Sequence, residues 1–293
     1  MRVGNYDKSL PLYRKALRIA KPFGAGDDRL TTTLDFLGNT YTALGLWTQS
    51  ERAFRRALPM VESTAGRDSV AYGLLMLDIG NMFGNSDRYD RAEAPMRESF
   101  TILTKVLPAD DSRVAIVRAS YAAVLIYRKR YRDAEDVARE GLVIERQSKE
   151  SCTALGSLYD VLGLAVLRQG RYEEAVPLQE HALRTTEGCL GPKHPALVRL
   201  LNNVAATYSE MHKAAAADAT FLRAMSIAEQ TLGADHPLYG KLLSNYAVFL
   251  RQSHRKGEAK KMAARSESVL RESARKDGAG LTVDASAFRL QRR

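Results

Sequence analysis

The sequence contains few of the features that mark several large classes of protein. Two cysteines in 293 residues are too few for a disulfide framework or a four-cysteine zinc site. No apolar run approaches the roughly 18 residues of a membrane-spanning helix, and residues 1–8 lack the apolar core of a signal peptide. These absences predict a soluble, cytoplasmic protein with no role at a membrane.

The motifs that usually carry catalysis or metal binding are also missing. The sequence has no Gly-x-x-x-x-Gly-Lys phosphate loop and no Gly-x-Ser-x-Gly nucleophile elbow. Its five histidines include no His-x-x-x-His pair, and four of them recur 42 residues apart, as His194 with His236 and His212 with His254. We therefore expect no enzymatic activity, no metal and no cofactor.

Positive charge is concentrated near the C-terminus. The chain carries 44 Lys and Arg against 34 Asp and Glu, a net charge of +10. Residues 251–293 contain 12 basic and 5 acidic residues, whereas the first 250 residues are nearly balanced. A whole-protein nucleic-acid binder is expected to spread its basic residues over a working face. Nucleic-acid binding through the basic C-terminus is therefore only an alternative hypothesis.

The strongest signal is an internal repeat of 41 or 42 residues. A small residue recurs as Ser9, Ser50, Ala92, Ala134, Ala175, Ala217 and Ala259. A second follows each after seven positions, as Ala16, Ala57, Ser99, Gly141, Ala182, Ala224 and Ser266. Aromatic residues precede the first five anchors by three positions, and a third small column holds Gly38, Gly80, Ala122, Gly163, Ala205 and Ala247. A period of this length is typical of solenoid proteins.

Each repeat unit predicts two amphipathic helices joined by a tight turn. Apolar residues are spaced by three and four positions, for example in residues 195–210 and 214–229. The small columns allow neighbouring helices to approach to about 8–10 Å, and one hairpin cannot bury its apolar face alone. We therefore expect an all-α, right-handed α-α superhelical solenoid of about seven helix-turn-helix repeats, the first one incomplete.

These columns resemble the tetratricopeptide repeat. The period of 42 resembles the longer version found in kinesin light chains and many bacterial proteins. Residues 191–195, Gly-Pro-Lys-His-Pro, and residues 201–205, Leu-Asn-Asn-Val-Ala, look like the linker and first helix of that subtype. No heptad coiled coil of the kinesin light chain accompanies them, so the resemblance is to the repeat and not to the whole kinesin subunit.

The repeat pattern also predicts the domain organisation. A repeat domain is expected over residues 1–275, followed by a flexible basic tail at 276–293. Its predicted parts are a half-repeat at 4–20 and repeats at about 28–62, 69–103, 111–145, 152–187, 194–229 and 236–270. The half-repeat lacks its hairpin partner. It is expected either to self-associate with another chain or to continue a longer array, and we favour the longer array.

The resemblance implies that the first helix of each repeat lines a concave groove for an extended peptide. The positions carried over from the family are polar in the N-terminal third, apolar in the middle and basic in the C-terminal third. The candidate groove residues are Asn39, Leu77, Asn81, Ile126, Tyr127, Arg168, Arg199, Asn202, Lys241 and Arg251. They predict a protein or peptide partner with an apolar centre and an acidic end. The alternative is that the apolar residues pack in the solenoid and the charges are solvated.

Two further expectations remain open. Cys152 and Cys189 flank one predicted hairpin, so a disulfide is possible, although two free thiols are favoured for a cytoplasmic protein. The functional prediction is a non-catalytic protein-interaction module. The first alternative is the sensor region of a larger signalling protein, and the second is the nucleic-acid binder considered above.

Overall fold

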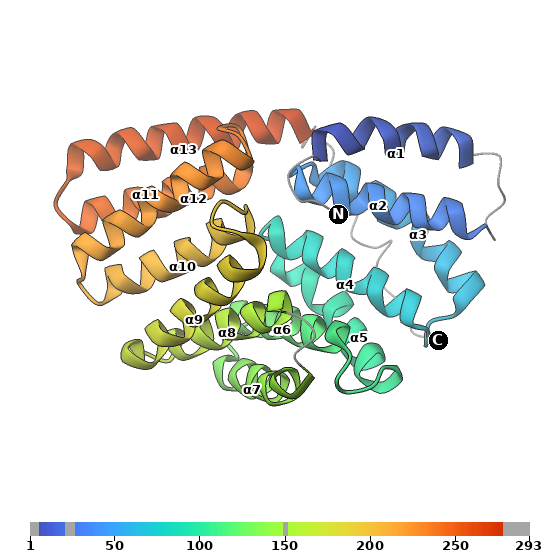
Figure 1. Cartoon of the computed structure of the whole chain (residues 1–293). Coiled ribbons are helices and arrows are strands. Elements are labelled where there is room, and N and C mark those ends of the chain that lie inside the picture. Colours follow the sequence, from blue (N-terminus) through green and yellow to red (C-terminus); the bar gives the residue numbers. More distant parts are fainter. Residues whose placement is uncertain (1–5, 21–26, 149–151, 278–293) are drawn as a thin grey trace. The chain divides into compact units, whose positions relative to one another are not determined.

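The computed structural model describes residues 6–20, 27–148 and 152–277, and all regular secondary structure in them is helical (Figure 1). This confirms the predicted all-α helical-repeat fold. The helices are α1 (Tyr6–Ala20), α2 (Asp28–Ala43), α3 (Trp47–Ala65), α4 (Val70–Asn85), α5 (Tyr89–Val106), α6 (Ser112–Tyr127), α7 (Tyr131–Ser148), α8 (Cys152–Arg168), α9 (Tyr172–Leu190), α10 (Ala196–Glu210), α11 (Ala214–Thr231), α12 (Pro237–Gln252) and α13 (Lys256–Asp277).

The even-numbered helices from α2 to α12 are the first helices of the repeats, and the odd-numbered helices that follow them are the second helices. The two helices of a repeat pack closely, as in α2 with α3, α4 with α5, and α8 with α9. Helix α1 stands where the sequence predicts the half-repeat and contacts α2. The sequence-predicted tail begins at residue 276. Helix α13 continues to Asp277, and residues 278–293 lie outside the described residues.

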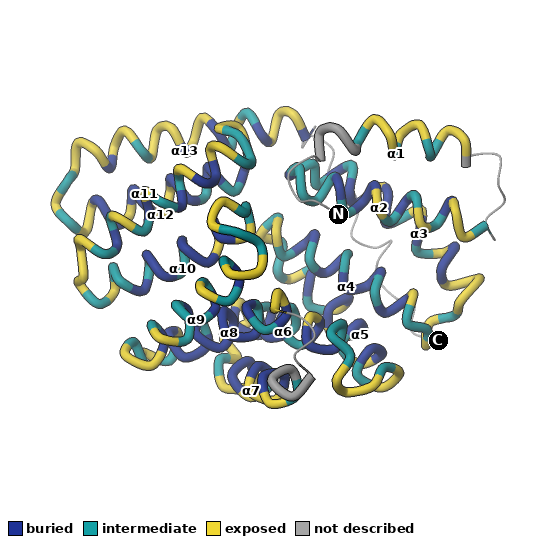
Figure 2. Tube along the Cα trace, viewed as in Figure 1, coloured by how far each residue is buried: buried dark blue, intermediate teal, exposed yellow. Residues whose placement is uncertain are grey.

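The contacts between helices group the repeats into two compact units. The repeat domain that the sequence predicts over residues 1–275 stays a prediction. One unit is Ala109–Ser273, which contains α6 to α12 and most of α13. Helices α1 to α5 belong to the other unit. Figure 2 shows that in both units the buried residues line the sides on which helices of a pair face each other. Exposed residues follow the opposite sides.

The small-residue columns mark the places where paired helices touch. A Cβ atom on Gly38 would lie 2.4 Å from the Phe54 ring, and one on Gly80 would lie 2.6 Å from the end of Met96. Both distances are shorter than real Cβ contacts allow. At these two glycines the paired helices approach as closely as the small-residue columns predict.

The histidines serve the repeat geometry. His212 and His254 adopt positive φ values of 56° and 62° in the turns between first and second helices. His194 and His236 precede first helices, and the Nδ1 atom of each accepts a hydrogen bond from a backbone N–H two residues later, at 3.1 Å. Turn and cap roles thus explain why these four residues recur one repeat apart.

Candidate functional site

Successive first helices contact one another in the Ala109–Ser273 unit: α6 with α8, α8 with α10, and α10 with α12. Seven of the sequence-predicted residues lie on these helices, and all but the buried Ile126 are at least partly exposed. We call the surface that the other six form the first-helix face, and its members are Tyr127, Arg168, Arg199, Asn202, Lys241 and Arg251.

Arg199 is the most strongly bound of the predicted cations. Its guanidinium forms an ion pair with Asp160 of α8, whose side chain is only 1% exposed. Asn203 Nδ2 also donates to Asp160, at 3.0 Å. The charge of Asp160 raises the pKa of Arg199 above its ordinary value. Half of the Arg199 side chain remains exposed, and a guanidinium has five N–H donors, so it can hold a ligand carboxylate as well as Asp160.

Two other predicted cations stand unpaired at the ends of first helices. Arg168 ends α8 and Arg251 lies in the last turn of α12, and both are exposed without an ion-pair partner in the described residues. Tyr127 ends α6 and is 54% exposed. The first-helix face therefore presents an aromatic ring and free guanidinium groups at corresponding ends of its helices.

Amide and hydroxyl groups link α10 to α12 on the same face. Asn245 Nδ2 donates to Asn202 Oδ1 at 2.9 Å, and Ser209 Oγ donates to Gln252 Oε1 at 3.0 Å. Lys241 is partly buried beside them. These contacts orient Asn202, whose amide can still offer hydrogen bonds to a peptide backbone.

Two of the apolar residues predicted to contact a ligand are buried in the structure. Leu77 is 5% exposed and Ile126 is 7% exposed, so both pack in the core and are not available to a ligand. For these two residues the alternative interpretation, ordinary solenoid packing, fits better. Ile116, at 37% exposure, and Val248, at 41%, are accessible apolar side chains on α6 and α12.

Asn39, Leu77 and Asn81 belong to the other unit, on α2 and α4. Asn39 Nδ2 donates to Asp78 Oδ2 at 2.8 Å, so this amide is engaged within the protein. Asn81 is half-buried. These residues belong to one compact unit, and those of α6 to α12 belong to the other. The single groove that the sequence predicts across all of them stays a prediction.

A pair of carboxyl groups on α2 and α4 was missed from the sequence. Burial, together with the charge of Asp78, raises the pKa of Asp35 to about 7. Burial also raises the pKa of Asp78. The sequence contained one signal for this pair, because Asp35 and Asp78 stand on the facing sides of two neighbouring first helices.

A series of ion pairs joins neighbouring second helices and was also missed. Glu51 binds Arg88 at 3.0 Å, Glu135 binds Arg171 at 3.0 Å, and Asp218 binds Arg255 at 2.7 Å. Each acid follows the repeat's small anchor by one position, and each arginine stands 36 or 37 residues later. The sequence contained this signal as a column of acids and a column of arginines. In the next equivalent positions, between α9 and α11, Val176 and Lys213 replace the pair.

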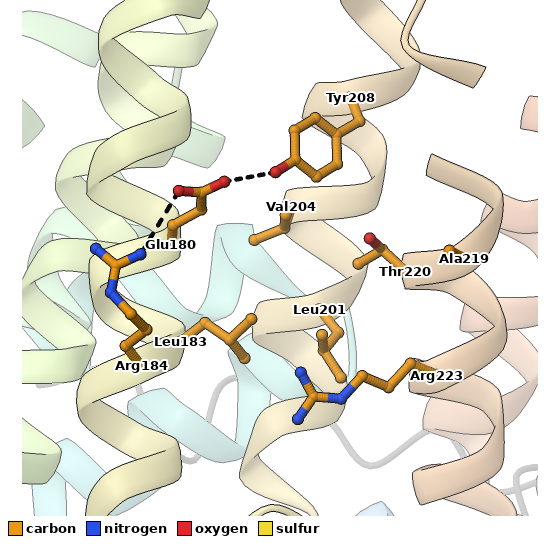
Figure 3. A pocket seen from close by; sticks show the side chains of 9 residues that line it. All are labelled: Glu180, Leu183, Arg184, Leu201, Val204, Tyr208, Ala219, Thr220 and Arg223. Carbon is orange, nitrogen blue, oxygen red and sulfur yellow. Dashed lines mark hydrogen bonds and ion pairs between the residues drawn. The ribbon is translucent and has the colours of Figure 1, made fainter. Parts of the chain in front are cut away.

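A pocket of about 430 Å³ is lined by residues of α9, α10 and α11 (Figure 3). Leu183, Leu201 and Val204 supply apolar surface. At the rim, Tyr208 Oη donates to Glu180 at 2.5 Å, and Arg184 lies 3.6 Å from the same carboxylate. Such a pocket can receive an apolar side chain, but its polar lining groups already form hydrogen bonds or ion pairs within the protein.

Cys152 and Cys189 form a disulfide between the start of α8 and the end of α9, with Cα atoms 6.3 Å apart. The structure therefore contains the disulfide, and the free thiols that the sequence favours are absent from it. It closes the open end of one helix hairpin.

No group of three or more His, Cys, Asp or Glu residues in the described part of the chain is arranged to hold a metal ion. No helix there combines the length and the apolar character needed to cross a bilayer.

Comparison with known proteins identifies the repeat. The family described as "Tetratricopeptide repeat" matches residues 1–63, 28–105, 153–230 and 199–272. The Arabidopsis thaliana Protein KINESIN LIGHT CHAIN-RELATED 2 is 25% identical over 215 residues, which are 72% of this chain and 32% of that protein. The chain thus spans about a third of the length of this curated relative.

Two solved structures share the fold. BtubC (BKLC) from P. vanneervenii has a TM-score of 0.54 at 14% identity, covering 80% of this chain and 91% of that chain. A Rap protein complexed with Competence and Sporulation Factor has a TM-score of 0.57 at 14% identity, covering 91% and 86%. The family match covers more than half of the chain, so the chain belongs to the tetratricopeptide repeat family, and its repeats are similar to those of the kinesin light chain-related plant protein.

Proposed function

We propose that this chain is a non-catalytic, cytoplasmic protein-interaction scaffold whose first-helix face binds an extended segment of a partner protein. The observation that carries the proposal is the combination of exposed Tyr127 with the unpaired guanidinium groups of Arg168 and Arg251 on one set of helices. Exposed aromatic and arginine side chains are the residue types that most often dominate protein interfaces.

The chemistry of this face favours a partner segment with an acidic end and an apolar part. Arg168, Arg251 and the exposed half of Arg199 supply forked donors for carboxylates. Tyr127, Ile116 and Val248 supply accessible apolar surface, in place of the buried Leu77 and Ile126. The solved Rap protein complexed with Competence and Sporulation Factor supports the general idea that this fold can receive another molecule.

The test is selection of ligands followed by charge reversal. A random peptide library displayed on phage is panned against the full chain, and the affinities of the selected peptides are measured by fluorescence anisotropy. The double variant Arg168→Glu/Arg251→Glu should weaken binding by at least tenfold, because it replaces two attractive contacts with repulsive ones. Arg184→Glu on α9 is the matched control, since its side chain is also exposed but lies off the first-helix face. Equal affinity for the double variant and the wild type would remove this face from the proposal.

A second candidate function is the interaction region of a larger signalling protein. The observation that favours it is that the chain corresponds to about a third of its plant relative. An antibody raised against residues 109–273 would detect a band well above 32.5 kDa in native extract if the repeats belong to a longer protein. A single band at 32.5 kDa would remove this candidate.

Nucleic-acid binding through the basic C-terminus remains the weaker alternative, and residues 278–293 lie outside the described residues. It requires steep salt dependence of binding to DNA or RNA and loss of that binding on deletion of residues 276–293.

A further inference from the structure

Two carboxyl groups meet at the junction of α2 and α4 without a cation between them. Asp35 of α2 stands one helical turn before Asn39, the residue of α2 that contacts Asp78 of α4, so the two acids lie on the same α2–α4 junction and the charge of Asp78 acts on Asp35. Asn39 donates to Asp78 Oδ2 at 2.8 Å. Oδ1 of Asp35 is enclosed and has no hydrogen-bond partner. A buried carboxylate is normally paired with a cation or with several donors, so this arrangement requires a physical explanation.

At the corresponding junction between α8 and α10, the buried acid is paired with a cation. Asp160 occupies in its repeat the place that Asp35 occupies, three residues before the small residue of the first helix. Arg199 forms an ion pair with Asp160, and Asn203 donates a second hydrogen bond to it. One acid there meets one cation and one amide, and the charges balance.

The α2–α4 junction lacks both partners. The place of Asn203 is held by Asp78, and the place of Arg199 is held by Leu74, as counted from Gly80 and Ala205. An amide has been replaced by a second acid and a guanidinium by an apolar side chain. The junction therefore has two carboxyl groups and no protein cation at the position where its counterpart has one.

The other elements packed against this pair do not supply the missing cation in the described residues. Arg14 of α1 donates to the Tyr41 hydroxyl at 3.2 Å. Arg88 and Arg91, beside and within α5, bind Glu51 of α3 at 3.0 and 2.8 Å. The charged group that acts on Asp35 is Asp78.

We propose that Asp35 and Asp78 share a single proton near neutral pH, and that this proton makes the α2–α4 junction sensitive to pH. One carboxyl group takes the proton from solvent and donates an O–H···O⁻ hydrogen bond to the other, which stays ionised. Release of the proton to solvent leaves two negative charges side by side in a poorly hydrated site. Their repulsion weakens the contact between α2 and α4. This inference does not rest on the proposed peptide-binding role.

The sign of the effect follows from the direction of the shift. Burial and the neighbouring charge raise the pKa of Asp35 to about 7 in the folded protein, above the value of about 3.9 for an exposed aspartate. Between these two values the folded chain holds a proton that the unfolded chain has lost. Stability therefore falls as pH rises from about 4 to about 7, and the loss is complete above pH 7.

The first test is urea unfolding of the full chain from about pH 5 to about pH 8. One extra proton in the folded state makes the unfolding equilibrium constant rise by up to about tenfold per pH unit within this window. Asp35→Asn should abolish that contribution, while Asp160→Asn is the matched control and should keep it. All five histidines lie in residues 109–273, so their own titration is common to every variant and cancels in the comparison. Equal pH slopes for the wild type and Asp35→Asn would overturn the proposal.

The second test uses only the wild-type chain, so it does not depend on whether a variant folds. Aspartate carboxyl groups are labelled with ¹³C in the wild-type chain and followed by NMR over the same pH range. A shared proton predicts two aspartate resonances that move together with a midpoint near pH 7. A spectrum in which no such pair moves above about pH 5 would overturn the proposal without any stability measurement.

Discussion

Arg88 Nη1 lies 3.0 Å from Glu51 Oε2, and this contact joins the turn before α5 to the preceding second helix, α3. Arg91 of α5 binds the other oxygen of the same carboxylate at 2.8 Å. Arg55 of α3 adds a third guanidinium group, 3.5 Å from Oε1. The Glu51 side chain is 1% exposed, so its charge depends on these three cations for compensation. The equivalent pairs at Glu135 and Asp218 indicate that the contact sets the register between consecutive repeats.

Loss of the Glu51 carboxylate should therefore destabilise the chain. Glu51→Gln leaves three guanidinium groups without their shared partner, and we expect the free energy of unfolding to fall by about 3 kcal/mol. Urea unfolding measures the change. The control is Glu267→Gln, because Glu267 and its partner Arg271 are both more than 70% exposed and such pairs contribute less than about 1 kcal/mol. Equal effects of the two substitutions would contradict the role assigned to Glu51.

Substitution of alanine for glycine should have opposite effects on stability at Gly38, which touches α3, and at Gly84, where an added side chain touches no other helix. In Gly38→Ala, the added methyl group would lie 2.4 Å from the Phe54 ring, and the forced movement should cost about 1–3 kcal/mol. Gly84 also lies in a helix, α4, but a Cβ there meets nothing within 4 Å. Gly84→Ala should stabilise the chain by up to about 1 kcal/mol through helix propensity alone. Thermal unfolding of both variants checks the pair, and destabilisation by Gly84→Ala would show that its surroundings are tighter than described.

The Cys152–Cys189 disulfide should stabilise the α8–α9 hairpin. The bond spans 37 residues, and closing a loop of this length corresponds to about 3–4 kcal/mol in the chain-entropy treatment. Addition of a reductant should lower the melting temperature of the wild type and leave that of Cys152→Ser/Cys189→Ser unchanged.

The oxidation state of the two cysteines in the cell bears on the proposed compartment. Intact-mass spectrometry of protein isolated without reductant distinguishes the disulfide from two thiols by the mass of two hydrogen atoms. Disulfides are rare in the cytosol, so full oxidation in the cell would contradict the cytoplasmic assignment. Two free thiols in protein isolated from cells would agree with it.

The sequence was sufficient to predict the repeat because the small residues that permit close packing are themselves periodic. Gly38 and Gly80 could be assigned to helix contacts before any contact was known, and the structure shows those contacts. The same periodicity revealed that the recurrent histidines needed no metal to explain them.

The candidate site was less accessible to sequence reasoning. Leu77 and Ile126 were selected by their offset within the repeat, but exposure depends on how each helix is rotated and on what packs beside it. Asn39 was expected to face a ligand and instead donates to Asp78, since a single repeat does not reveal its partner in the next. Asp35 and Asp78 are 43 residues apart along the chain, and only the packing of α2 against α4 brings them to the same junction.

Position-specific crosslinking tests the central claim, that a partner polypeptide binds the first-helix face, most directly. A photoreactive phenylalanine derivative is placed at Tyr127 of α6, which is 54% exposed, or at Val143 of α7, which is 62% exposed. Each protein is irradiated with the peptides selected from the display library. The account predicts crosslinking from position 127 and none from position 143, whereas crosslinking from position 143 alone would contradict it.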